Sequence, residues 1–258
     1  RKSKMNKFYI ETSGGHVEEI EKAFLYAVNL AKADKEVRRI IFYSFTKSNF
    51  MQVNMYFKNL IGRCLTADGF KISGMDVLVK CETRITYNKQ YSNDKTDVVI
   101  ACHMSSKDIY ALDDDAKTKY IVAIPWMEHD VDEWVRRWNA IEISGENKEK
   151  PVEKVINPLL PVALYEMDVN MFETKSLSHQ SDEETCKTYI RVIHKHLPDI
   201  SPEDIENYLV RELSWTAENA HKVGELLGRL KAQRTFQGGA KTGLQDYYKR
   251  WKNKLNDK

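Results

Sequence analysis

The stretch that decides the fold is Phe8–His16, which reads Phe-Tyr-Ile-Glu-Thr-Ser-Gly-Gly-His. A short apolar run ends in a turn with two glycines, and an amphipathic helical pattern begins at once with Val17. This order predicts a strand, a tight loop and the N-terminus of a helix. Unpaired backbone N–H groups and the positive end of the helix dipole meet at such a terminus, so it is a candidate anion site.

The same unit of strand, loop and helix recurs through the first half of the chain. Mostly apolar strands alternating with helical patterns favour a parallel sheet with right-handed crossovers. The sequence therefore predicts an α/β fold with a mainly parallel, doubly wound (Rossmann-like) sheet of about five strands. The strands expected after Phe8–His16 are Arg39–Phe45, Asp76–Cys81, Asp97–His103 and Lys119–Ile124, with a final edge strand over Ile141–Ile143 as an option.

One connection in this half does not follow the pattern. Glu82–Thr96 is polar and shows no helical periodicity. The pattern predicts an irregular connection, with a short extra strand over Arg84–Tyr87 as the alternative. Long irregular connections of this kind are often functional or disordered.

The strand signals stop after a polar stretch with Gly and Pro near its ends, Ser144–Pro151. We therefore expect an α/β domain over residues 1–144, a linker over 145–151 and an all-helical domain over 152–258. In the last part, Leu159–Val169 reads as a helix. Ser201, with proline next to it, and Thr216 are expected to cap two further helices.

The net charge of +2 is too small to identify a partner, but its distribution is uneven. Leu226–Lys258 holds nine Lys and Arg residues against two acids, with aromatic residues between them. Phosphate pairing and base stacking by such a segment would bind nucleic acid. The alternative is a terminal helix that docks through its aromatic residues and keeps its lysines in water.

The four cysteines show no metal-ligand spacing, and no apolar run approaches the ~18 residues of a membrane span. Nor does an apolar leader segment follow the first residues. The sequence therefore predicts reduced thiols, a cytoplasmic location, no membrane partner and no metal site.

The loop of Thr12, Ser13, Gly14, Gly15 and His16 is the first candidate ligand site. Its hydroxyls and glycines would let a phosphate or carboxylate approach the backbone closely. The alternative is a glycine pair that only makes a tight turn. The chain contains neither the dinucleotide fingerprint nor a P-loop at this position, so the loop does not identify its ligand.

Other candidate ligand residues follow the remaining strands, because ligands of open α/β sheets bind beyond the carboxyl ends of the strands. Thr46 and Lys47 follow the second strand, where a lysine suits a phosphate. His103 and Ser105 follow the fourth strand, and Trp126 follows the fifth. A histidine can exchange protons near neutral pH, and a tryptophan can stack on a flat ligand. Their alternative roles are a solvated lysine, helix caps and ordinary packing.

Two hypotheses of different classes result. In the first, the α/β domain binds a small anionic ligand, a nucleotide or phosphorylated metabolite, and the helical domain covers or regulates the site. In the second, the protein is a non-enzymatic interaction protein whose basic helical domain contacts nucleic acid or a protein partner. The sequence identifies no reaction, cofactor or oligomeric state.

Overall fold

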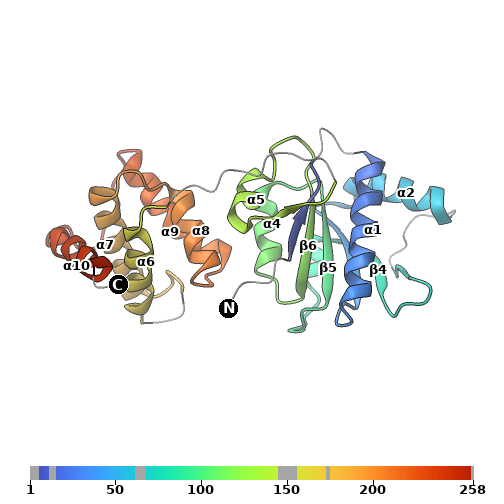
Figure 1. Ribbon diagram of the computed structural model, residues 1–258, viewed down its shortest axis with the longest axis horizontal. Coiled ribbons are helices and arrows are strands. Elements are labelled where there is room, and N and C mark those ends of the chain that lie inside the picture. Colours follow the sequence, from blue (N-terminus) through green and yellow to red (C-terminus); the bar gives the residue numbers. More distant parts are fainter. Residues whose placement is uncertain (1–5, 12–15, 62–67, 145–155, 173–174, 257–258) are drawn as a thin grey trace. The chain divides into compact units, whose positions relative to one another are not determined.

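The computed structural model describes residues 6–11, 16–61, 68–144, 156–172 and 175–256. Contacts divide the chain into two compact units, residues 1–151 and 152–258. The first unit is a sheet flanked by helices, and the described residues of the second form helices and loops without a strand (Figure 1). The predicted fold class is confirmed. The predicted linker over 145–151 lies outside the described residues.

A seven-stranded sheet with the order β3-β4-β2-β5-β6-β1-β7 forms the centre of the first unit. Every neighbouring pair is parallel except β3 and β4, which are antiparallel. The two strands beyond the predicted five are two-residue edge strands, β3 and β7. The strands are β1 (Lys7–Tyr9), β2 (Arg39–Ser44), β3 (Phe70–Lys71), β4 (Leu78–Thr83), β5 (Asp97–Cys102), β6 (Thr118–Ile124) and β7 (Ile141–Glu142).

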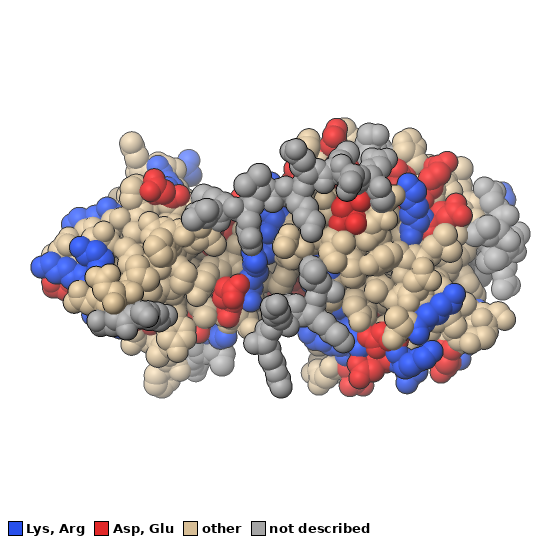
Figure 2. All heavy atoms as spheres, viewed as in Figure 1, with Lys and Arg blue, Asp and Glu red and all other residues tan. Residues whose placement is uncertain are grey.

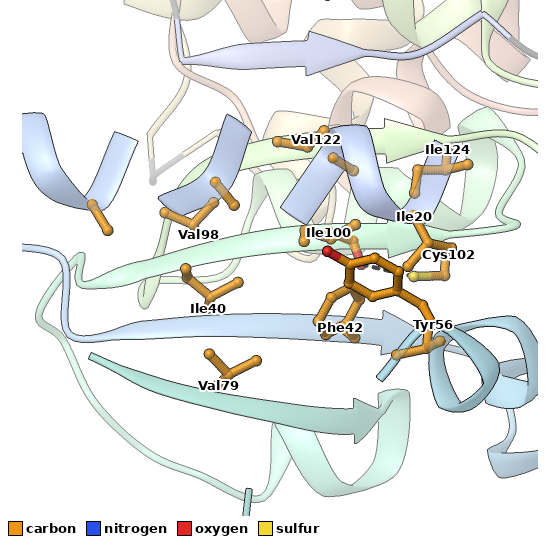
Figure 3. Packing of buried hydrophobic residues seen from close by; sticks show 14 of the residues in the cluster. Ile20, Ile40, Phe42, Tyr56, Val79, Val98, Ile100, Cys102, Val122 and Ile124 are labelled. Atoms are coloured by element: carbon orange, nitrogen blue, oxygen red, sulfur yellow. Dashed lines mark hydrogen bonds between the residues drawn. The ribbon is translucent and has the colours of Figure 1, made fainter. Parts of the chain in front are cut away.

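Helices cover both faces of the sheet. Helices α1 (Val17–Ala33) and α2 (Met51–Ile61) pack on one face, and α4 (Ser106–Asp113) and α5 (Asp132–Trp138) pack on the other (Figure 1). Successive side chains of a strand point to opposite faces. Ile40 and Phe42 of β2 therefore pack under α1 and α2, together with Ile20 and Tyr56 of those helices (Figure 3).

The prediction of an irregular connection over Glu82–Thr96 was wrong for its first part, whereas residues 89–96 contain no helix or strand. A short helix, α3 (Arg84–Asn88), begins directly after β4. Thr83 caps it, because the Thr83 N–H donates to Thr86 Oγ1 at 2.9 Å and Thr83 Oγ1 accepts from the Thr86 N–H at 3.4 Å. A helix of five residues is too short to show a 3.6-residue period in the sequence.

The second unit consists of α6 (Leu159–Val169), α7 (Gln180–His196), α8 (Pro202–Arg211), α9 (Ala217–Lys231) and α10 (Leu244–Asn256). The predicted caps are confirmed. Ser201 Oγ accepts from the Asp204 N–H, and Thr216 Oγ1 accepts from the Asn219 N–H, both at 3.2 Å. None of the described helices combines the length and apolarity needed to cross a bilayer.

Candidate ligand pocket

The loops after β2 and β5 diverge at the carboxyl edge of the sheet. These two strands are neighbours, yet β2 leads to α2 on one face while β5 leads to α4 on the other. Such a switch point leaves a crevice between the two loops, and open α/β sheets bind their ligands there. The topology alone therefore selects this edge as the first place to look for a site.

A pocket of about 290 Å³ lies at this edge. The 3₁₀ turn η1 (Lys47–Phe50) and the start of α2 form one wall, and the residues after β5 and β6 form the other. Two of the predicted residues, His103 and Trp126, meet here. The lining residues are Ser48, Asn49, Met51, Gln52, His103 and Trp126.

His103 is the first residue after β5 and has an unusual backbone. Its φ is +56°, a conformation that costs a non-glycine residue energy. A hydrogen bond from its N–H to the Ile124 carbonyl, at 2.6 Å, ties this residue to the end of β6. Strained residues of this kind cluster at ligand sites.

The imidazole of His103 has a buried nitrogen, Nε2, with no hydrogen-bond partner among the described residues. Burial lowers the pKa of His103, and the carboxylate of Glu19, in the first turn of α1, opposes this shift. The ring is therefore neutral at pH 7.

Trp126 forms the opposite side of the pocket from η1. Its ring meets the His103 ring edge to face, with 4.8 Å between the centroids and 83° between the planes. Half of its surface is exposed. Trp134 and Trp138 differ, because their indole N–H groups both donate to Asp113 Oδ2, at 2.9 and 2.8 Å. Ordinary packing, the alternative role for Trp126, therefore describes Trp134 and Trp138 better than Trp126.

The loop after β2 is organised by its own polar side chains. Thr46 Oγ1 lies 2.8 Å from Ser48 Oγ and donates to Asn49 Oδ1 at 2.6 Å. These contacts hold η1 in shape and so place Ser48 and Asn49 in the pocket wall. Lys47 is exposed on the same turn and does not line the pocket.

Two further predicted residues serve as helix caps. The N–H of His16, at the start of α1, donates to Glu19 Oε2 at 2.9 Å. The hydroxyl of Ser105 donates to Asp108 Oδ2 at 2.7 Å in the first turn of α4. Neither lines the pocket. The predictions for Thr12, Ser13, Gly14 and Gly15 lie outside the described residues.

Asn49, Met51 and Gln52 line the pocket but were not predicted. The sequence pattern indicates a helix from about Phe50, with Met51 and Gln52 in its first turn and Asn49 as a candidate cap. It does not show that a 3₁₀ turn precedes α2. The only usable signal was their place directly after a strand. No group of three metal-ligating side chains occurs among the described residues.

A larger cavity of about 400 Å³ lies in the helical unit, but several of its polar groups are already hydrogen-bonded within the unit. Thr188 Oγ1 accepts from the Ala240 N–H at 2.8 Å, and the Glu184 carboxylate accepts from the Gly239 N–H. The N–H of Gly239 in this glycine turn is therefore already bound to a carboxylate of the same unit. This cavity is the weaker candidate.

The basic C-terminal segment gathers Lys and Arg over α10 (Figure 2). Part of this charge acts within the unit, on the buried carboxylate of Glu166. That carboxylate accepts from Arg250 Nε at 3.0 Å, Lys254 Nζ at 2.6 Å and the Tyr189 hydroxyl at 2.9 Å. Burial raises the pKa of Glu166, but these donors outweigh it and bring the pKa to about 2.

The fold of the first unit is that of a doubly wound α/β sheet with a pocket at its switch point. Residues 156–252, in the helical unit, match the family model of a domain of unknown function, DUF1889. No curated protein and no solved structure matches the chain. The family match assigns no activity to this part of the chain.

Proposed function

We propose that the α/β unit binds a small anionic ligand, a nucleotide or phosphorylated metabolite, in the pocket at the carboxyl ends of β2, β5 and β6. The observation that carries this proposal is the buried, unpartnered Nε2 of His103, a residue that lines the pocket at the switch point of the sheet. A buried polar atom without a partner is costly, and a bound ligand would supply the partner.

We expect the charged group of the ligand to lie outside the pocket, on the side where Lys47 is located. Lys47 is exposed, and it is adjacent in the chain to Ser48 of the pocket wall. Glu18 and Glu19 add negative charge to the first turn of α1, which weakens the anion site expected from the helix dipole alone. An anion at the Gly14–Gly15 turn and regulation by the helical unit remain predictions, as does a cytoplasmic location.

Thermal unfolding of the full chain with a panel of nucleotides and phosphorylated metabolites tests this function. A ligand at about 100 times its Kd stabilises the folded state by about 2.7 kcal/mol. We expect at least one compound to raise the unfolding temperature of the wild type, with a smaller effect in Lys47→Gln and His103→Asn. A panel without any stabilising compound would contradict the proposal.

A second candidate function, contact with nucleic acid through the basic segment, rests on the surface beside α10. His196 and Tyr248 stack with 4.5 Å between ring centroids, and Lys252 Nζ lies 4.7 Å from the Tyr248 centroid. Burial lowers the pKa of His196, and the positive charges of Lys195 and Lys252 lower it further. The positive charge of this surface therefore belongs to the lysines and not to the imidazole. Single-stranded nucleic acid should then bind with a strong salt dependence, which Lys252→Glu should reduce. Binding that is insensitive to salt would contradict this candidate.

A further inference from the structure

We infer that the pocket holds a planar nitrogen heterocycle, such as a nucleobase, stacked on Trp126 and hydrogen-bonded to Nε2 of His103. This inference rests on the proposed function and narrows it, because it separates a ring-bearing nucleotide from a sugar phosphate. It also assigns the two parts of the ligand to different places. The ring enters the pocket, and the phosphate stays outside it.

The absence of charge in the pocket wall supports this assignment. The described lining residues offer hydroxyl, amide, thioether, imidazole and indole groups, and the imidazole is neutral at pH 7. None of them compensates a phosphate charge, and an uncompensated charge in a pocket is costly. An uncharged polar ring meets no such penalty.

The size of the pocket supports the same division. Pockets that enclose whole small molecules have volumes of about 300–1,000 Å³. At about 290 Å³, this pocket lies just below that range. It therefore suits a single ring system better than a complete nucleotide.

The groups in the wall match the edge and the face of a base. Trp126 is half exposed, and base stacking on an aromatic side chain tolerates any base. Nε2 of His103 can pair with a ring nitrogen or an N–H group, depending on its tautomer. Asn49 adds an amide, a group that proteins use to pair with base edges.

Titration calorimetry of the full chain with matched compounds tests the inference. The probes are the four ribonucleoside monophosphates, the corresponding nucleosides, ribose 5-phosphate and inorganic phosphate. We expect at least one nucleotide and its nucleoside to bind, and ribose 5-phosphate to bind roughly 10-fold or more weakly than that nucleotide. His103→Asn and Trp126→Leu should each weaken binding of that nucleoside roughly 5- to 100-fold.

His129→Asn is the matched control. His129 also has a positive φ, +73°, but it is exposed, pairs with Asp132 at 2.8 Å and does not line the pocket. This variant should bind as the wild type does, and circular dichroism checks that all variants fold. Equal affinity for ribose 5-phosphate and the nucleotide, or nucleosides that fail to bind, would overturn the inference and leave anion binding intact. If no probe binds, both the inference and the proposed function fall.

Discussion

At the scale of single residues, His103 carries two separable properties, a left-handed backbone and a buried imidazole nitrogen. Asparagine shares the tolerance for positive φ, whereas β-branched residues do not. Substitution can therefore remove the imidazole while keeping the backbone, or disturb the backbone as well. The comparison separates a role in binding from a role in folding.

We expect His103→Asn to change the free energy of unfolding little, and His103→Val to lower it by about 1–3 kcal/mol, because valine is strained at this φ. Urea unfolding of the three proteins measures the difference. Equal stability of the two variants would contradict the reading of this backbone as strained.

The sequence predicts His103 and Trp126 as ligand-binding residues because both follow buried strands. A parallel sheet brings such positions together at one edge. The sequence does not predict that Asn49 and Gln52 line the pocket, because their positions depend on a 3₁₀ turn that leaves no periodic signal. Nor could it show that Ser105 caps α4 without reaching the pocket. Side-chain direction at a loop follows from tertiary contacts.

At the scale of elements, length explains which predictions were confirmed. The range Leu159–Val169 agrees with α6, and Ser201 caps α8, because an extended periodic pattern and a cap are local signals. The five-residue α3 was misread as an irregular or extended segment, and the two-residue β3 was not predicted. Neither element is long enough to show a period. β3 is positioned by its pairing with β4, and α3 by the hydrogen bond from the Tyr87 hydroxyl to Asp97 of β5.

The docking of α10 depends on one carboxylate. Glu166 of α6 receives hydrogen bonds from Arg250, Lys254 and Trp251 of α10 and from Tyr189 of α7. We expect Glu166→Gln to lower the free energy of unfolding of the helical unit by about 2–3 kcal/mol. The loss is no larger because Arg250 and Lys254 are half exposed and keep part of their hydration.

Glu218→Gln is the matched control for this substitution. Glu218 also pairs with a lysine, Lys222 at 2.7 Å, but on the exposed face of α9. Exposed pairs of this kind contribute little to stability, because water screens the two charges. Denaturant unfolding monitored by circular dichroism compares the two variants, and equal losses would show that the Glu166 cluster does not hold α10.

The same carboxylate predicts an acid dependence. Its pKa falls from 4.5 to about 2 on folding, so its contribution is present in full above pH 4.5 and is lost as the pH falls towards 2. The difference in unfolding free energy between wild type and Glu166→Gln should be constant above pH 5 and should shrink below pH 4.5. A difference that does not change down to pH 2.5 would contradict the charged state assigned to Glu166.

At the scale of the whole molecule, the two units have different kinds of core. The α/β unit is built on a sheet buried on both faces, and the helical unit on packed helices. Scanning calorimetry of the full chain should therefore resolve two transitions, and Glu166→Gln should lower the temperature of one of them. A single transition that moves as a whole in this variant would show that the units unfold together.

The central claim is the location of ligand binding at the carboxyl edge of the α/β sheet. Hydrogen–deuterium exchange of the full chain, with and without a saturating mixture of the four ribonucleoside monophosphates, tests that location most directly. We predict protection in the peptides that contain residues 45–52, 102–106 and 124–128, and unchanged exchange over residues 156–252. Protection confined to residues 156–252, or no protection in either unit, would contradict the account.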